Sequence, residues 1–247
     1  MSSQDKLKAR KDQILEAAER VFARNGFQES TVSEIAKEAR VSDGTIYEYF
    51  STKEGLLFSI PEAFIAKVRE QNRFHLQLIR GAANRLRAIV YLYLYTWQEH
   101  PDYAIINLLI LKGNLNFRKT EGYRLIREGF QEITQIIEEG IASREFRGDI
   151  NPYVIRSVLM GAVDHVTTNW VLSGRKHGLV DLVDPIMDLV MTGLTSEAPP
   201  AAGEPGPWYH WRPSQGTPAS GGQATGLANA SLGGGQGVAS AVEPDDH

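Results

Sequence analysis

Apolar residues recur at intervals of three and four along most of the first 195 residues, the spacing typical of amphipathic α-helices. A first stripe is followed by Asn25–Gly26, a typical helix stop. Further stripes cover 125–141, 152–173 and about 180–194. The pattern therefore predicts an all-α protein, whose first stripe is formed by Ile14, Ala17, Ala18, Val21 and Phe22.

Residues 88–97, AIVYLYLYTW, carry two conflicting signals. The aromatic residues alternate with period two, which favours a strand. No second strand-like run is present to pair with it, and an isolated strand would leave its backbone groups without partners. We therefore predict a helix, and because it is apolar on all sides we expect it to be buried at the centre of a bundle.

The segment between residues 31 and 57 is organised differently, as short helices with little to bury. Thr31 and Glu34 form a capping box that begins one helix, and Ser51 and Glu54 form another that opens a helix running towards Pro61. Between them, residues 41–50 place only Ile46 and Phe50 on a narrow apolar arc. A helix followed by a short turn and a short second helix forms a helix-turn-helix, in which the second helix enters a DNA major groove.

The sequence TVSEIAKEARVSDGTIYEYFSTKEGLL, residues 31–57, closely resembles the DNA-binding segment of the TetR family of bacterial transcriptional repressors. The resemblance implies a three-helix helix-turn-helix domain over 1–52 and a helical effector-binding and dimerisation domain over 53–195. It also implies a homodimer on an inverted-repeat operator of double-stranded DNA. A competing interpretation is an interaction module whose helix-turn-helix contacts protein.

The expected DNA contacts follow from the chemistry of each position. A lysine in the first turn of a helix, as at Lys53, opposes the helix dipole unless a phosphate lies there. Gly44 allows close approach to the groove, and Arg40 stands where the family usually has glycine, so it either strains the turn or contacts phosphate. Residues 6–11 form a basic arm, or a solvated charge run. The full set of expected contacts is Lys11, Thr31, Arg40, Ser42, Asp43, Gly44, Thr45, Tyr47, Tyr49 and Lys53.

The last two predicted helices each carry an apolar stripe. Family resemblance implies that such helices pair with their copies in a four-helix interface. The alternative is that both stripes close the core of one chain. The residues expected at the interface are Ile155, Leu159, Ala162, Val166, Ile186, Met187 and Val190.

Residues 138–174 resemble the acyl-CoA-responsive, fatty-acid-degradation repressors within the family. This resemblance implies a small hydrophobic effector, a long-chain acyl-CoA, with phosphates near a basic mouth formed by Lys112, Arg118 and Lys119. A drug or an aromatic metabolite is the alternative. The residues expected to line the effector site are Tyr91, Tyr95, Asn107, Arg118, Tyr123, Asn169 and Trp170.

Composition and charge bear mainly on the C-terminal tail and on the classes of protein that can be excluded. Residues 197–247 hold one basic and five acidic residues, which leaves 25 of each in the rest and accounts for the net charge of −4. This Ala/Gly/Pro-rich tail, 196–247, is predicted to be disordered, and its WYHW cluster could dock on a partner. The absence of cysteine fits a cytoplasmic location, and the apolar runs are too short to cross a membrane. Catalytic motifs such as GxSxG and HExxH are absent, so we expect no enzyme, cofactor or metal site.

Overall fold

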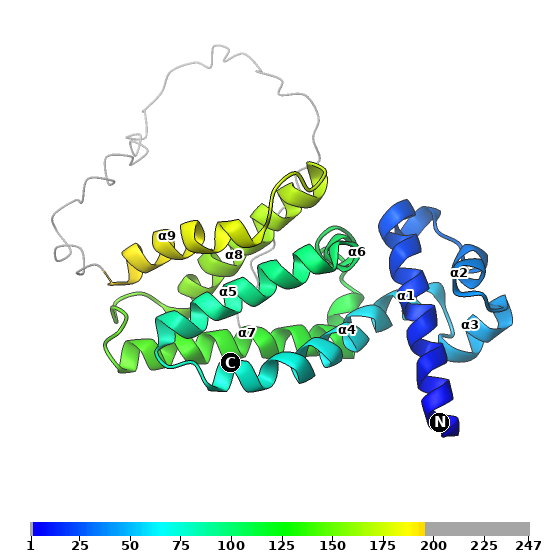
Figure 1. The fold of residues 1–247 in the computed structure, drawn as a ribbon, viewed down its shortest axis with the longest axis horizontal. Coiled ribbons are helices and arrows are strands. Elements are labelled where there is room, and N and C mark those ends of the chain that lie inside the picture. The colour runs from blue at the N-terminus through cyan, green and yellow to red at the C-terminus, as the bar shows by residue number, and fades with distance from the viewer. Residues whose placement is uncertain (1, 196–247) are drawn as a thin grey trace, which may run out of the picture. The chain divides into compact units, whose positions relative to one another are not determined.

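The computed structural model describes residues 2–195, apart from the side chains of Ser3 and of residues 69–77. Within this range every regular element is helical: nine α-helices, one π-helix and two short 3-10 turns (Figure 1). The all-α prediction is therefore confirmed. The predicted disordered tail and its WYHW cluster lie outside the described residues. No helix among residues 2–195 is both long and apolar enough to span a membrane.

The first hydrophobic core belongs to the N-terminal helices α1 (Ser3–Glu29), α2 (Val32–Ala39) and α3 (Asp43–Tyr49), and to the start of α4 (Lys53–Gln77). The predicted stop at Gly26 is a kink, where φ is 77° and ψ is 168°. Because α1 already begins at Ser3, the basic residues 6–11 lie on this helix and do not form a separate arm. The fully buried side chains of this core include Ile14, Phe22, Ile35, Ile46, Leu56 and Ile60.

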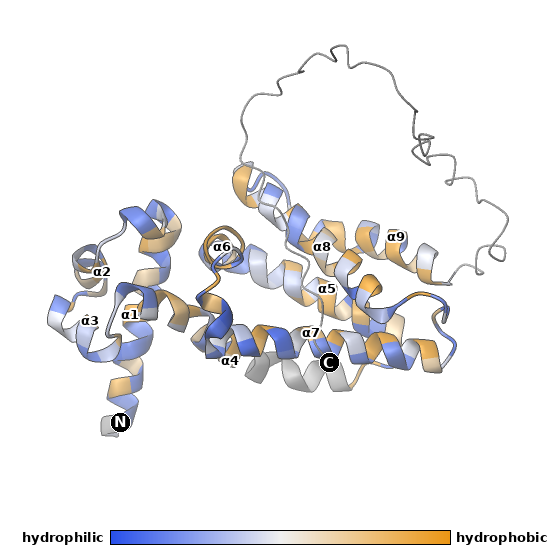
Figure 2. Ribbon diagram, turned by 180° about the vertical axis from the view of Figure 1, so that it is seen from behind, coloured by the Kyte–Doolittle hydropathy of each residue, from blue (hydrophilic) through white to orange (hydrophobic). Residues whose placement is uncertain are grey.

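A second core lies among α5 (Ala82–Glu99), α7 (Glu121–Ala142), α8 (Pro152–Leu172) and α9 (Val183–Thr195). Three of these helices confirm the predicted stripes over 125–141, 152–173 and 180–194. Thr120, at the end of the 3-10 turn Phe117–Lys119, caps α7, and the 3-10 turn Val180–Leu182 precedes α9. Hydrophobic residues recur along α8 and α9 (Figure 2). The buried residues include Leu86, Leu94, Ile133, Leu159, Val163 and Met187.

The two cores are joined through α6 (Pro101–Ile105) and the π-helix Ile106–Leu111 that continues it. Ile106 and Leu111 are buried in the first core, whereas Ala104 and Leu108 are buried in the second. A π-helical turn is an uncommon element. In this π-helix and the end of α6, neighbouring side chains are buried in different cores. The helix-turn-helix and the remaining helices therefore pack against the same segment.

The prediction that residues 88–97 form a helix is confirmed, but the prediction that this helix is buried all round is wrong. Leu94 and Trp97 of α5 are buried, whereas Tyr91 and Tyr95 are 42% and 43% exposed. The two tyrosine rings stack on each other, with centroids 5.9 Å apart and planes 5° from parallel. The physical reason is that a tyrosine ring with a solvated hydroxyl tolerates the helix surface, which hydrophobic periodicity does not register.

Candidate functional site

Helix α2 is fixed at its start by the predicted capping box. The hydroxyl of Thr31 accepts from the Glu34 backbone N–H at 3.2 Å, and Glu34 Oε2 accepts from the Thr31 N–H at 2.8 Å and from its hydroxyl at 3.0 Å. These bonds stabilise the charged carboxylate and lower the pKa of Glu34. Thr31 is exposed at the beginning of the helix, but its hydroxyl already has partners within the chain.

The turn between α2 and α3 passes through Arg40, which has φ 53° and ψ 47°. Its N–H bonds to the carbonyls of Ala36 and Lys37, and the Val41 N–H bonds to the Ala36 carbonyl at 2.9 Å. A non-glycine residue in this left-handed conformation costs on the order of 1 kcal/mol. The strained-turn interpretation of Arg40 therefore agrees with the backbone, and the side chain itself is exposed.

Helix α3 is held by polar caps and a small apolar contact. Ser42 Oγ accepts from the Thr45 N–H at 3.1 Å and lies 2.9 Å from the Thr45 hydroxyl. The Ser33 hydroxyl of α2 donates to the Asp43 carboxylate. Ile46 is 1% exposed and Phe50, at the end of the helix, is 5% exposed. The helix is thus anchored along one edge, as its narrow apolar arc predicts.

The outer side of α3 faces solvent at Ser42, Asp43, Gly44 and Tyr47, and Tyr47 is 53% exposed. A Cβ added at Gly44 would meet only Ser42 Oγ, at 3.7 Å, so no contact within the chain requires a glycine there. Tyr49 is only half-buried, and its ring lies 6.1 Å from that of Phe50. The two tyrosines therefore differ: Tyr47 is available to a partner, while Tyr49 also covers the core.

Two lysines flank this surface. Lys11 of α1 places its Nζ 5.9 Å from the centroid of the Phe50 ring. Lys53 Nζ donates to the carbonyls of Phe27 at 2.8 Å, Ser30 at 2.8 Å and Gln28 at 3.3 Å. It also lies 4.5 Å from the Phe27 ring centroid. Lys53 therefore ties the start of α4 to the end of α1, a role that explains its position without an external anion.

The cap of α4 also differs from the sequence expectation. The Gly55 N–H donates to Thr52 Oγ1 at 2.9 Å, so Thr52 rather than Ser51 supplies this hydroxyl. Ser51 and Thr52 are adjacent, and either hydroxyl could cap the helix on sequence grounds. The conformation of the backbone after Phe50 decides which of them does so.

The residues expected to line the effector site do not converge. Tyr91 and Tyr95 lie on the outer side of α5, Asn107 lies on the π-helix, and Asn169 on the exposed side of α8 lies 3.1 Å from His165 Nε2. Trp170 is buried and its Nε1–H donates to the His177 carbonyl at 2.6 Å. Arg118 and Tyr123 are the two members of the set that line a common hollow, at the start of α7.

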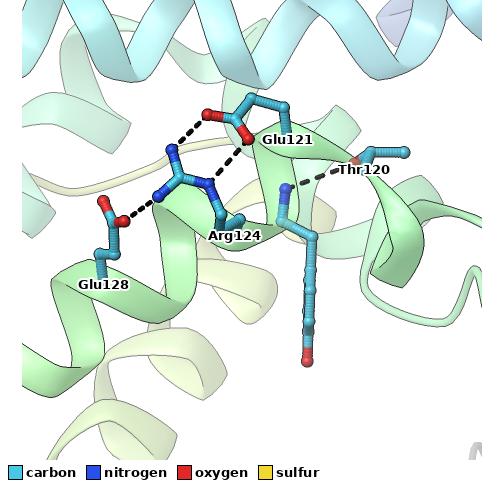
Figure 3. Close-up of polar contacts among 5 residues, drawn as sticks. Thr120, Glu121, Arg124 and Glu128 are labelled. Carbon is cyan, nitrogen blue, oxygen red and sulfur yellow. Dashed lines mark hydrogen bonds and ion pairs between the residues drawn. The ribbon is translucent and has the colours of Figure 1, made fainter.

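That hollow, which we call the α7 hollow, has a volume of about 330 Å³ and is lined by Arg118, Lys119, Thr120, Glu121, Tyr123, Arg124 and Arg127. The Arg124 guanidinium donates hydrogen bonds to the carboxylates of Glu121 and Glu128 (Figure 3), and it lowers the pKa of Glu121. Neither Lys119 nor Arg127 forms an ion pair with another described residue. Arg127 is not among the residues expected from the sequence, although basic residues cluster around this helix start. Lys112, the third member of the expected basic mouth, instead pairs with Asp164 at 2.8 Å.

The residues expected at the dimer interface face the chain's own core. Ile155 and Met187 are each 4% exposed, and Leu159 is fully buried. Ile186 belongs to the same core, and the partly buried Ala162, Val166 and Val190 pack against it. These side chains therefore close the second core, the alternative that the sequence left open. The exposed apolar residues on the same two helices are Val154, Val158, Leu172 and Leu189.

Comparison with known proteins decides the family. A family model described as "Bacterial regulatory proteins, tetR family" matches residues 14–60. Another, described as "YsiA-like protein, C-terminal region", matches residues 62–193. The chain belongs to the TetR family. It is therefore a DNA-binding transcriptional regulator.

Among TetR-family relatives, the fatty acid metabolism regulator protein of Bacillus subtilis (strain 168) is 31% identical over 188 residues, covering 74% of this chain and 94% of the relative. The crystal structure of B. subtilis FadR in complex with stearoyl-CoA is 30% identical, with a TM-score of 0.69, and covers 74% of this chain and 98% of that one. The structure of the fatty acid degradation regulator FadR from Bacillus halodurans has a TM-score of 0.65, at 30% identity and the same coverage.

Proposed function

We propose that this TetR-family regulator is a repressor that binds an inverted-repeat operator as a homodimer and is released by a long-chain acyl-CoA. The observation that carries the proposal is the similarity to FadR of B. subtilis, which was crystallised in complex with stearoyl-CoA. That similarity spans nearly all of the relative, including both the helix-turn-helix and the helices beyond it.

The exposed side of α3 supports operator binding. Gly44 leaves room for the backbone to approach base edges, and Tyr47 offers a hydroxyl to phosphate or base. Thr31, Ser42 and Arg40 are exposed beside it. Tyr47→Phe should weaken operator binding, because it removes this hydroxyl and leaves the ring. A gel shift with DNA from upstream of the protein's own gene tests this, and unchanged affinity would remove Tyr47 from the contact set.

An exposed apolar surface on α8 and α9 supports the homodimer. Val158 is 59% exposed and Leu189 is 80% exposed. A Cβ added at Gly161 or Gly193 would meet no atom within 4 Å, so neither glycine is required by packing within the chain. Small residues of this kind allow two helices to approach closely, which supports a dimer contact on this outer face rather than on the buried stripe.

Sedimentation of single-residue variants tests the dimer. Val158→Asp should convert the protein to a monomer and abolish operator binding, because two carboxylates would be buried at the symmetric contact. Leu115→Asp is the matched control, since Leu115 is 71% exposed on a loop outside α8 and α9. A dimeric Val158→Asp protein would place the interface elsewhere.

The α7 hollow supports an effector that carries phosphates. Lys119 and Arg127 are exposed, and both line this hollow. We assign the phosphates of the acyl-CoA to this hollow and its chain to the interior of the helical domain, where burial stabilises an acyl chain by up to about 0.8 kcal/mol per methylene. Lys119→Gln and Arg127→Gln should each raise the concentration of stearoyl-CoA needed to release the operator.

The matched control for these substitutions is Lys8→Gln, which removes an exposed charge on α1, a helix that does not line the hollow. If Lys8→Gln weakens release as much as Arg127→Gln does, the loss of any positive charge on the protein explains the result, and the phosphate assignment is wrong. Release by drugs or aromatic metabolites in place of acyl-CoA would support the alternative effector class instead.

A further inference from the structure

A second hollow of about 330 Å³ lies where the helix-turn-helix domain packs on the rest of the chain. Arg20, Ala23 and Arg24 of α1 line one side, and Asp102 and Ile105 of α6 line the other. Arg175, from the segment that follows α8, completes it. We call it the joint hollow. Three guanidinium groups and one carboxylate therefore share a small space between two domains.

One of these guanidinium groups forms no ion pair with another described residue, and a second is only loosely paired. Arg20 Nε donates to Glu38 Oε1 at 2.9 Å, so its charge is paired. Arg24 is exposed and forms no ion pair with another described residue, although its charge contributes to lowering the pKa of Glu34 on α2. The Arg175 guanidinium lies 3.9 Å from Asp102 Oδ1, which is too long for a hydrogen bond.

Arg175 is held in place by its backbone. It has φ 62°, follows Gly174 at φ 83°, and donates its N–H to the Trp170 carbonyl at 2.9 Å. Its guanidinium lies 6.0 Å from the Trp170 ring centroid. A non-glycine residue in a left-handed conformation is strained and persists where the surroundings impose it. The side chain is thus directed to the joint hollow by a constrained turn.

The nearby carboxylates only partly offset these charges. Asp102 lines the hollow itself, and Glu19 lies one helical turn before Ala23 on α1. Burial, together with the charge of Asp102, raises the pKa of Glu19 to about 7. Near neutral pH, Glu19 therefore carries only part of a negative charge. The residues that line the hollow, three arginines and Asp102, carry a positive net charge.

We propose that the joint hollow binds a small phosphate-bearing anion, held by Arg24 of the helix-turn-helix domain and by Arg175 of the effector domain. Guanidinium groups bind phosphate through paired, charge-assisted hydrogen bonds. The anion would connect α1 to the segment after α8, so it would stabilise the packing of the two domains. This site is separate from the α7 hollow, to which we assign the acyl-CoA phosphates.

Calorimetric titration of the full-length protein with inorganic pyrophosphate, in the absence of DNA and at an ionic strength held constant with chloride, tests the proposal. Arg24→Gln and Arg175→Gln should each weaken pyrophosphate binding by about tenfold or more, because each removes one charge-assisted pair. Because the proposed function gives the α7 hollow a phosphate site of its own, the titrations are made in an Arg127→Gln background, which weakens that site. Lys8→Gln, which removes an exposed charge on α1 outside both hollows, is the matched control and should leave the affinity within about twofold.

Two results would overturn the proposal. One is an absence of pyrophosphate binding to the wild-type protein at millimolar concentration. The other is binding that survives both Arg24→Gln and Arg175→Gln. Because the two substitutions lie in different domains, a folding defect in one variant leaves the other as an independent test.

Discussion

The strongest prediction for the free protein concerns Lys53, whose ammonium group donates to three backbone carbonyls at the end of α1. We consider Lys53→Met, which keeps most of the aliphatic chain and removes the charge. The substitution leaves the carbonyls of Phe27, Gln28 and Ser30 without this donor and removes the contact with the Phe27 ring.

The expected cost follows from these contacts. A hydrogen bond from a charged group contributes about 1.5–3 kcal/mol, and a cation over an aromatic ring about 0.5–1 kcal/mol. The three bonds share one ammonium, and water can replace part of them because Lys53 is only half-buried. We therefore expect Lys53→Met to lower the free energy of unfolding by about 2–3 kcal/mol, less than the sum of separate bonds.

Urea denaturation of the wild type, Lys53→Met and the control Lys8→Met measures this cost, and the control should change stability by less than about 0.5 kcal/mol. A similarly small loss for Lys53→Met would refute the structural role. The same variant tests the phosphate contact that the sequence suggests. If Lys53 also neutralises a phosphate, the slope of log binding constant against log salt concentration should become shallower by about one in Lys53→Met. An unchanged slope would leave Lys53 only its structural role.

Three further substitutions test local features of the fold. Arg40→Gly should raise the free energy of unfolding by about 1 kcal/mol, because glycine adopts φ 53° without strain; a loss in thermal denaturation would contradict this. Glu19→Gln should stabilise the protein by about 2 kcal/mol at pH 8 and hardly at all near pH 4. Because folding raises the pKa of Glu19, the wild-type protein loses stability as pH rises from about 4.5 to about 7, and this loss is at most about 3 kcal/mol. If the free energies of unfolding of the two proteins changed in parallel with pH, this explanation would be wrong. Gly140→Ala should cost at least about 2 kcal/mol in urea denaturation, since its Cβ would lie 2.3 Å from the Phe146 ring. Gly129→Ala on the same helix, with ordinary space, serves as control, and equal effects would argue against the steric explanation.

Local patterns predicted the helical elements well. The capping box at Thr31 and the kink at Gly26 involve residues close in sequence, so their hydrogen bonds and backbone preferences can be inferred without tertiary structure. The short apolar arc of α3 likewise indicated Ile46 and Phe50 as its only anchors, and both are buried.

Features that depend on distant segments could not be predicted in this way. The carbonyls bound by Lys53 lie 23 to 26 residues earlier in the chain, so a helix-start argument could only suggest an external anion. On α8, apolar residues occur on two neighbouring faces. Ile155 and Leu159 are buried while Val154 and Val158 are exposed, and periodicity alone does not say which face meets the core. The joint hollow likewise combines α1, α6 and Arg175, which lie far apart in sequence.

The most direct test of the proposed function is a titration of the preformed protein–operator complex with acyl-CoAs of increasing chain length, followed by fluorescence anisotropy of labelled DNA. We expect release that strengthens with chain length towards stearoyl-CoA, and little release by free CoA or free fatty acids at the same concentrations. By linkage, saturating operator should weaken acyl-CoA binding by the same factor. Release that is independent of chain length, or that occurs only with unrelated aromatic compounds, would contradict the acyl-CoA assignment.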